Sequence, residues 1–466
     1  DTSARKQQET PDTQMPREKL LIIGGVAAGM SAASRSRRRN PELDITVLEK
    51  GQHVSYGACG LPFYISGQVA DAGELVVYTP EYFREKRNID VRLGVEAKEI
   101  DPGRKRVLAV ERASQPIALT YDKLVIATGG AAGGSEIPGA DWPGVFTIGD
   151  LAGAIRLRDF LDEKKPRRAV IVGAGYIGLE MADALKRRGM EVAMIGKSAQ
   201  MIEGFEAEIS ARVEEEFLAQ GVRIFKHSAV RMISHGAGGK IEVHHGDTSE
   251  AAEIVVLATG IAPRSAMAEA AGIPLGAGGA IRVDDRMQTE IPGIYAAGDC
   301  AETRNLVSGK AAYFPLGTTA NKQGRVAGEN AAGGNARFDG IVGTLGTSAF
   351  GLEIARTGLT MAEGRAAGFD PTSVTIRTVS RAKYLGGRPL VATLLWDHPS
   401  GRLLGFQIVG EAGAAKRIDA AAVALHARMR IQDLQHLDLC YAPGFAPVWE
   451  ALLLAAGEAV KKSRRD

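Results

Sequence analysis

The stretch Leu20-Leu21-Ile22-Ile23-Gly24-Gly25-Val26-Ala27-Ala28-Gly29 joins a short apolar run to a glycine-rich turn. A helix-like stretch rich in alanine and arginine follows, and a second apolar run at 45–48 ends at Glu49. Strand, glycine turn, helix, strand and acid in this order predict one βαβ nucleotide-binding unit. The turn lets a pyrophosphate approach N–H groups at a helix N-terminus, and the acid accepts hydrogen bonds from a ribose. Val26 replaces the middle glycine of the usual motif, which weakens the motif on its own.

A second copy of this layout begins near residue 169. An apolar run leads into Gly173-Ala174-Gly175-Tyr176-Ile177-Gly178, and a helix-like stretch and an apolar run at 191–195 follow. One glycine motif is weak evidence, but two in the required context predict two dinucleotide-binding domains. The second run is followed by Gly196-Lys197-Ser198 instead of an acid, which favours NADPH over NADH; a pocket that accepts both is the alternative. Tyr176 is placed to lie over a nicotinamide ring.

Further apolar runs at 124–129, 255–260 and 294–299 also end in turns that contain glycine. The last of them ends in Gly298-Asp299, and an aspartate there can hydrogen-bond a flavin ribityl chain or a phosphate-bridging hydroxyl. This downstream aspartate disfavours the alternative that 20–29 form a tight turn without a ligand.

The pattern changes after residue 340. Alternating runs such as 390–396 and 403–409 predict strands, and helices are expected at about 414–429 and 447–460. The region therefore predicts a separate α+β domain.

Length and composition limit the class of protein to which this chain can belong. The chain has 466 residues, 45% of them hydrophobic and 24% charged, which suits two or three globular domains. A net charge of +2 gives no global field that would attract nucleic acid, and no apolar stretch reaches the roughly 18 residues that span a membrane. Residues 1–18 are expected to be a disordered polar leader. Three cysteines without a paired framework fit a reducing, cytoplasmic compartment, and no metal site is predicted.

Cys59 is the most informative residue outside the glycine turns. A second thiol four or five residues away would allow an internal disulfide, but Phe63 and Tyr64 occupy those positions. The sulfur partner of Cys59 must therefore come from a small molecule. An apolar helix-like stretch follows Cys59, so a helix dipole is expected to stabilise its thiolate; a buried packing cysteine is the alternative. Cys300 is expected to be structural, and Cys440 is a weak candidate for a second redox thiol.

With these residues in place, the chain resembles the flavoprotein pyridine nucleotide–disulfide oxidoreductases, and most closely their single-cysteine branch. That branch includes coenzyme A-disulfide reductase, coenzyme A-persulfide reductases, NADH oxidase and NADH peroxidase. The resemblance covers about residues 19–461, and its most specific parts are Ser55 with Cys59, the stretch 315–325, and Tyr441-Ala442-Pro443. It implies an α/β fold with two Rossmann-like domains and a C-terminal α+β dimerisation domain. The implied order is FAD domain 19–148, NAD(P)H domain 149–276, FAD domain again at 277–339, and dimerisation domain 340–461.

The resemblance implies FAD and NADPH or NADH as cofactors and a homodimer as the active unit. Cys59 would cycle through a mixed disulfide with coenzyme A. Tyr441, helped by Tyr384, would come from the partner subunit as a general acid. The implied cofactor-binding residues are Gly24, Val26, Ala27, Ala28, Gly29, Glu49, Lys50, Ala127, Thr128, Gly129, Gly173, Gly175, Tyr176, Ile177, Gly178, Glu180, Gly196, Lys197, Gly260, Gly298, Asp299, Pro315, Leu316, Gly317 and Ala320.

Coenzyme A carries several phosphates, so its site should be cationic. Arg35 and Arg38 are three residues apart on one helix face; exposed helix arginines are the alternative. Ala58 stands where the branch often has an asparagine before the cysteine. The resemblance implies substrate contacts at Ser31, Arg35, Arg38, Ser55, Arg87 and Asn321.

The predicted activity is reduction of coenzyme A disulfide by NAD(P)H. Reduction of coenzyme A persulfide or polysulfide by the same thiol is the alternative. An NADH oxidase is less favoured, because such enzymes carry a histidine at the position of Ala27. Electron carriers that resemble ferredoxin reductases form a different class, and they lack a cysteine at the position of Cys59.

Overall fold

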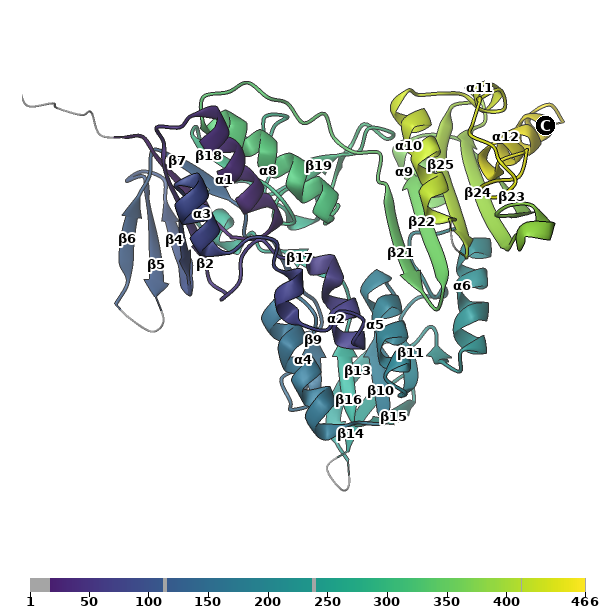
Figure 1. The fold of residues 1–466 in the computed structure, drawn as a ribbon, viewed down its shortest axis with the longest axis horizontal. Helices are drawn as coiled ribbons and strands as arrows, with labels where there is room; N and C mark the ends of the chain where they lie inside the picture. Colours follow the sequence, from purple (N-terminus) through teal and green to yellow (C-terminus); the bar gives the residue numbers. More distant parts are fainter. Residues whose placement is uncertain (1–16, 112–114, 237–239, 412, 466) are drawn as a thin grey trace, which may run out of the picture.

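The computed structural model describes residues 17–111, 115–236, 240–411 and 413–465. These residues form three bodies, each with one five-stranded sheet, which we call the first, middle and C-terminal bodies (Figure 1). Most of the predicted leader, residues 1–18, lies outside the described residues. No helix within the described part of the chain combines the length and the apolar character needed to cross a membrane.

The first body contains the first glycine turn. Its sheet has the order β18-β7-β1-β2-β3, with every pairing parallel. An antiparallel sheet β4-β5-β6 and the short pairs β8-β17 and β19-β20 complete its strands. The strands are β1 Lys19–Ile23, β2 Asp44–Glu49, β3 Asp90–Leu93, β4 Val95–Asp101, β5 Arg106–Glu111, β6 Ile117–Thr120, β7 Lys123–Ile126, β8 Gly130–Ala132, β17 Ile261–Pro263, β18 Ile294–Ala296, β19 Thr303–Arg304 and β20 Ala311–Ala312.

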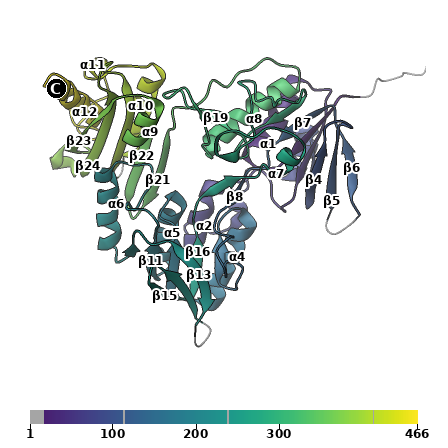
Figure 2. The ribbon, with the colours of Figure 1, turned by 180° about the vertical axis from the view of Figure 1, so that it is seen from behind.

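Two helices of the first body pack unusually closely. Helix α1 (Ala27–Arg39) lies beside α8 (Gly317–Ala331) in both views (Figures 1 and 2). A Cβ built on Gly324 or Gly328 of α8 would lie 2.2 or 2.3 Å from a carbonyl oxygen of α1. Glycine is therefore required at this crossing, which lets the first half of α1 pack directly against the second half of α8. The remaining helices are α3 Pro80–Arg87 and α7 Ala266–Ala270.

The middle body repeats the parallel arrangement. Its sheet has the order β12-β11-β10-β16-β9, beside an antiparallel sheet β13-β14-β15. Strand β9 joins this sheet just before the predicted boundary at residue 149; the domain boundaries stay predictions. The strands are β9 Val145–Thr147, β10 Arg168–Val172, β11 Glu191–Ile195, β12 Arg223–Phe225, β13 Val230–His235, β14 Ile241–His245, β15 Thr248–Ala252 and β16 Ile254–Leu257, and the helices are α4 Leu151–Lys164, α5 Tyr176–Arg187 and α6 Ala207–Ala219.

Helix α2 (Leu61–Ser66) connects the first two bodies. It directly follows the Cys59 segment in sequence but packs with α4 and α5 of the middle body (Figure 1). Arg158 of α4 donates hydrogen bonds to the carbonyls of Tyr64 and Val69, at 2.8 and 2.9 Å. Arg188 donates to the carbonyl of Ile65 at 3.1 Å. Two arginines thus bind carbonyls at the C-terminal end of α2, where the helix dipole favours cations.

The C-terminal body is an antiparallel sheet of order β21-β22-β25-β24-β23 with helices against it. Expected strands at 390–396 and 403–409 are present as β24 and β25. The strands are β21 Leu345–Ala349, β22 Leu352–Gly358, β23 Pro371–Val379, β24 Pro389–Asp397 and β25 Leu403–Gly410, and the helices are α9 Met361–Ala367, α10 Ile418–His426, α11 Ile431–Leu434 and α12 Ala451–Ser463.

Two helices of this body begin later than predicted. The helix expected from 414 begins as α10 at Ile418 after a short 3₁₀ turn, and that expected from 447 begins as α12 at Ala451. Arg417 accounts for the later start of α12, because it donates to the carbonyl of Phe445 at 3.1 Å and pairs with Glu450 at 2.8 Å. These contacts hold 445–450 outside the helix.

Candidate functional site

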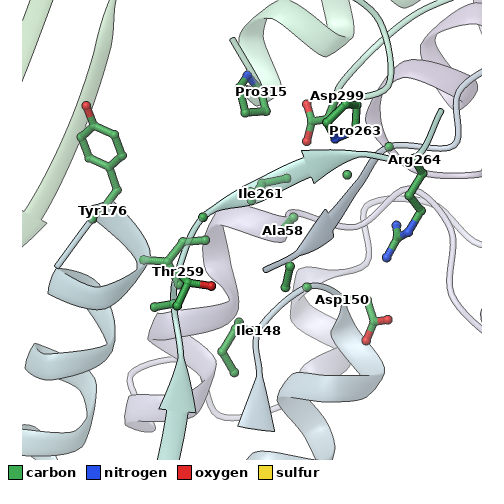
Figure 3. A pocket seen from close by; sticks show the side chains of 18 of the residues that line it. Ala58, Ile148, Asp150, Tyr176, Thr259, Ile261, Pro263, Arg264, Asp299 and Pro315 are labelled. Atoms are coloured by element: carbon green, nitrogen blue, oxygen red, sulfur yellow. The ribbon is translucent and has the colours of Figure 1, made fainter. Parts of the chain in front are cut away.

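A single cavity of about 1350 Å³ contains both glycine turns. Its wall also includes residues of the C-terminal body, so all three bodies contribute to it. In Figure 3, Asp299 and Pro315 lie on one side of β17, and Tyr176 lies apart from them at the start of α5. The predicted cofactor residues in its wall are Gly24, Val26, Ala27, Ala28, Glu49, Lys50, Ala127, Thr128, Gly129, Gly173, Gly175, Tyr176, Ile177, Glu180, Gly196, Lys197, Gly260, Gly298, Asp299, Pro315, Leu316, Gly317 and Ala320.

Two predicted cofactor residues do not line the cavity. A Cβ on Gly29 would lie 1.8 Å from the carbonyl oxygen of Gly24, and one on Gly178 would lie 2.3 Å from that of Gly173. These glycines allow each helix to pack against its own turn. Their effect on a ligand is therefore indirect.

The first glycine turn has the geometry that a dinucleotide needs. Gly24 has φ +110°, and a Cβ there would lie 2.0 Å from the carbonyl oxygen of Ala127. The Glu49 carboxylate accepts bonds from the N–H groups of Gly25 and Gly51, at 2.8 and 2.7 Å, and is thereby fixed at the edge of the cavity. Val26, the N-cap of α1, makes no side-chain capping bond, so the turn presents backbone donors to a phosphate.

Asp299 gives the cavity a second carboxylate. It follows Gly298, which has φ +85°, at the end of β18. Burial raises the pKa of Asp299, and nearby Arg264 partly offsets this. A largely buried acid in the cavity wall suits a ligand with hydroxyl donors. The glycine turn, Glu49 and Asp299 together fit FAD.

The second glycine turn repeats the first. Gly173 also has φ +110°, and its Cβ would lie 2.2 Å from the carbonyl oxygen of Ala258. Tyr176 stands at the start of α5, and burial raises the pKa of its hydroxyl to about 12. Near neutral pH this tyrosine is therefore uncharged. Its aromatic ring lines the cavity, which suits a neighbour of a nicotinamide ring.

One cavity residue near the end of β11 was not predicted from the sequence. Glu203 lines the cavity with Lys197 and Ser198, and the Ser198 hydroxyl donates a hydrogen bond to the Glu203 carboxylate. Standard spacing places a ribose-binding acid directly after the strand, whereas Glu203 comes eight residues after Ile195. The only sequence signal for Glu203 was an acidic residue shortly after Gly196-Lys197-Ser198.

Cys59 lies in the wall of the same cavity. It occupies a 3₁₀ turn, Ala58–Gly60, immediately before α2, and its thiol is exposed to the cavity. Burial raises the pKa of the thiol, and the carboxylates of Glu180 and Asp299 raise it further. The expected net stabilisation of the thiolate by a helix terminus is therefore wrong, because desolvation and two acids outweigh the backbone.

Glu180 is placed to influence that thiol. It accepts a 2.7 Å hydrogen bond from Thr347 of β21, and burial raises the pKa of its carboxyl group. The other two cysteines lie elsewhere. Cys300 is buried with its sulfur 3.4 Å from the carbonyl oxygens of Ile126 and Ala297, and Cys440 is exposed on the C-terminal body and does not line the cavity.

The predicted substrate residues lie outside the cavity wall, around α1. Arg38 has a lowered pKa, caused by burial and by three neighbouring cations, Arg87, Arg35 and Arg325. One of the four has a clear acidic partner, since Arg35 pairs with Glu329 at 2.6 Å. We call Arg35, Arg38, Arg87 and Arg325 the arginine cluster.

Several uncharged groups adjoin this cluster. Ser31 of α1 donates a 2.7 Å hydrogen bond to Asn321 of α8. The rings of Tyr78 and Tyr82 stack with centroids 4.4 Å apart, and the Arg87 guanidinium lies 5.6 Å from the Tyr82 centroid. Ser55, at φ +51°, takes part in backbone bonds to Gly25 and Val77. The stacked tyrosines and Arg325 were not predicted as site residues, since only the fold places them near Arg38.

The two predicted tyrosine acids lie on the C-terminal body, away from the cavity wall of their own chain. Tyr384 and Tyr441 are 79% and 50% exposed. Their segments are joined by a 3.4 Å hydrogen bond from Ala382 N to the carbonyl of Pro443. The same face exposes other large apolar side chains: Leu385, Phe445, Val448 and Trp449.

Comparison with known families identifies the fold. Residues 18–324 match the pyridine nucleotide-disulphide oxidoreductase family, and residues 346–452 match its dimerisation domain. The chain belongs to this family. Its members use FAD and NAD(P)H, so the predicted family, fold class, enzyme class and cofactors are confirmed.

Individual relatives narrow the resemblance. The chain is 39% identical over 445 residues to NAD(P)H sulfur oxidoreductase (CoA-dependent) of Pyrococcus furiosus, covering 95% of this chain and 99% of that one. It is 28% identical to coenzyme A disulfide reductase of Staphylococcus haemolyticus, covering 92% and 96%. The structure of a NAD-dependent persulfide reductase from A. fulgidus superposes with a TM-score of 0.92 at 38% identity, covering 96% of this chain and 84% of that one.

Proposed function

We propose that this chain reduces coenzyme A disulfide with NAD(P)H and that Cys59 is its single redox thiol. The observation that carries the proposal is the position of Cys59 in the cavity that contains both dinucleotide turns. Among the described residues it is the only cysteine in that wall. A disulfide within this cavity of one chain is thus not available, and we take the sulfur partner to be a dissolved molecule.

The reaction follows from thiol–disulfide exchange. The Cys59 thiolate attacks one sulfur of the substrate, a Cys59–sulfur bond forms, the substrate disulfide breaks, and one coenzyme A thiolate leaves with a proton. FAD, which the first glycine turn, Glu49 and Asp299 would hold, would pass the two electrons of NAD(P)H to the mixed disulfide and so split it. Cys59 is thereby released as thiolate, and the second coenzyme A leaves. One NAD(P)H and one proton reduce one disulfide to two thiols.

The arginine cluster supports coenzyme A as the substrate. Its 3′-phospho-ADP portion carries several negative charges, and bidentate guanidinium groups suit phosphates. The stacked rings of Tyr78 and Tyr82 adjoin Arg87 and offer an apolar face to an adenine base. Ser31 and Asn321 add hydrogen-bonding groups between this cluster and the helix termini.

The proposed role of the tyrosines requires a homodimer, and an exposed apolar patch supports one. Leu385, Phe445, Val448 and Trp449 are exposed next to Tyr384 and Tyr441, and such a patch is typical of a face that binds a partner. In a symmetric dimer, each C-terminal body would bring its tyrosines to the Cys59 of the other subunit. Tyr441, with Tyr384, would protonate the leaving thiolate.

Coenzyme A persulfide is the second candidate substrate. Relatives named for sulfur or persulfide reduction are 38–39% identical to this chain, against 27–28% for the coenzyme A disulfide reductases. The same thiolate attack would release hydrosulfide instead of a first coenzyme A. One NAD(P)H and one proton would then yield coenzyme A and hydrogen sulfide.

Replacement of the thiol tests the proposal. Cys59→Ser should keep bound FAD and hydride uptake but lose reduction of coenzyme A disulfide, because no mixed disulfide can form. Cys440→Ser is the matched control and should remain active. Mass spectrometry of the untreated protein should show an adduct of coenzyme A mass on Cys59. Full turnover by Cys59→Ser would overturn the assignment, and rates with coenzyme A disulfide, coenzyme A persulfide and oxygen would rank the acceptors.

A separate variant tests whether Tyr441 is the general acid. Tyr441→Phe removes only a hydroxyl, so turnover should slow while the flavin content and the rate of flavin reduction stay the same. An unchanged turnover rate would exclude Tyr441 as the general acid.

A further inference from the structure

We propose that Glu203 binds the adenosine ribose of the nicotinamide cofactor and sets the preference between NADH and NADPH. Strand β11 ends at Ile195 and is followed by a glycine, a lysine and a serine, so the standard ribose-binding acid is absent. Glu203 restores a carboxylate at this place, because it lines the cavity with Lys197 and Ser198 and accepts a hydrogen bond from the Ser198 hydroxyl. The inference rests on NAD(P)H binding at the second glycine turn and not on the sulfur acceptor.

The segment that carries Glu203 is held in place by the C-terminal body. Arg356, which is 4% exposed, donates a hydrogen bond to the carbonyl of Gly204. Two residues further on, the Glu206 N–H donates to Gln407 at 2.7 Å, and the Glu206 carboxylate accepts from the Met361 N–H at 2.9 Å. The backbone beside Glu203 is thus held by contacts within the protein.

The conformation of Gly204 adds to this constraint. Its φ is +78°, and a Cβ there would lie 2.6 Å from Arg356 Nη1. Glycine at 204 therefore lets the guanidinium reach the backbone. Because protein contacts hold this segment, a contact from Glu203 to the ribose should cost little entropy of loop ordering.

The charges near the ribose position oppose each other. The 2′- and 3′-hydroxyls of NADH are donors that a carboxylate accepts, so Glu203 favours NADH. The 2′-phosphate of NADPH is attracted by Lys197 and by Arg231, which also line the cavity, but it is repelled by Glu203. Lys197 without Glu203 would favour NADPH over NADH. With Glu203 five residues beyond Ser198, the enzyme should accept both cofactors, and the carboxylate should set their ratio.

The test measures flavin reduction alone. Holoenzyme is mixed anaerobically with NADH or NADPH, and kcat/KM for flavin reduction is obtained for each. Glu203→Gln should raise the NADPH-to-NADH ratio of kcat/KM by about tenfold, the scale of one charge removed a few ångströms from a phosphate. The change should lie mainly in KM and shrink at high ionic strength. Lys197→Met should move the ratio in the opposite direction.

Glu208→Gln is the matched control, since Glu208 is an exposed acid in the first turn of α6 that does not line the cavity. A ratio that stays within twofold of the parent in Glu203→Gln, or an equal shift in Glu208→Gln, would overturn the proposal. Because no sulfur acceptor is present, failure of coenzyme A disulfide as a substrate would leave this result unaffected.

Discussion

Arg417 and Glu450 form an ion pair with Nε and Oε1 2.8 Å apart, and both side chains are only 12% exposed. The same guanidinium donates to the carbonyls of Ser380 and Phe445, at 2.6 and 3.1 Å. Ser380 precedes Tyr384 by four residues, and Phe445 follows Tyr441 by four. One arginine therefore connects the two segments that carry the proposed acids.

Loss of Arg417 should slow the step that depends on Tyr384 and Tyr441. It should leave FAD binding and flavin reduction unchanged. Arg417→Met is expected to lower turnover with coenzyme A disulfide several-fold, while FAD content and hydride uptake remain those of the parent. It should also destabilise the C-terminal body by about 3 kcal/mol, because Glu450 is left partly buried without its partner. Stopped-flow and steady-state rates separate the two half-reactions, and chemical unfolding measures the stability.

The matched control is Arg388→Met, which breaks an exposed pair with Glu411 at 3.4 Å. Exposed pairs contribute about 0–1 kcal/mol, so this variant should behave like the parent. Equal turnover in the two variants would show that Arg417 does not position the tyrosines.

The Cys59 thiol should become more acidic when a neighbouring carboxylate is removed. Glu180 raises the pKa of Cys59, and Gln at 180 can still accept the hydrogen bond from Thr347. Glu180→Gln should therefore lower the pKa of Cys59, so that the thiolate forms at a lower pH. The rate of thiol alkylation, measured against pH in reduced enzyme, reports this pKa directly.

Asp183→Asn serves as the comparison for Glu180→Gln. Asp183 lies on the same helix but pairs with Arg187 at 3.0 Å and does not line the cavity. Its alkylation profile should match that of the parent. A profile for Glu180→Gln that also stays unchanged would show that the two groups do not interact.

The arginine cluster should act on the nucleotide part of the substrate. Arg38→Gln and Arg87→Gln are each expected to raise KM for coenzyme A disulfide by about tenfold, since each removes a cation from a phosphate site. Pantetheine disulfide lacks the nucleotide, and its kinetics should be unchanged by either substitution. Arg104→Gln, in an exposed turn of the first body, is the control variant. Equal losses with both substrates would place the arginines in a structural role.

The two glycine turns made the parallel sheets predictable because they combine a local conformational need with a hydrophobic pattern. Gly24 and Gly173 both adopt φ +110°, which ordinary residues avoid, so the sequence signal and the structural cause coincide. No local feature of the sequence predicts that Cys59 lies in the same cavity. Its placement depends on α2 packing against α4 and α5, far along the chain.

Residues brought together only by tertiary structure were not predictable. Tyr78 and Tyr82 adjoin the arginine cluster because Arg87 lies next to Arg38, a contact between α3 and α1 that no spacing reveals. The pKa of Cys59 also depends on Glu180, more than a hundred residues away in sequence. The local sequence suggested a stabilised thiolate at Cys59. Desolvation and acids far away in the sequence instead raise the pKa of this thiol.

A buried histidine should make the stability of the middle body depend on pH. His245 of β14 is 1% exposed, and neither ring nitrogen has a hydrogen-bond partner within the described residues. Burial lowers its pKa below the ordinary value, and Glu250 offsets this only partly. As pH falls below about 6.5, the unfolded chain binds a proton that the folded chain resists, so stability falls with pH, and above that value the contribution is constant.

Replacement by an aromatic ring of similar shape should remove this dependence. His245→Phe is expected to match or exceed the parent in stability at about pH 8, because it leaves no unsatisfied nitrogen next to Phe225, and its advantage should grow toward about pH 5. Thermal unfolding across this range, with exposed His436→Gln as the comparison, measures the effect. Parallel pH profiles for the parent and His245→Phe would show that His245 is protonated as readily in the folded chain as in the unfolded one.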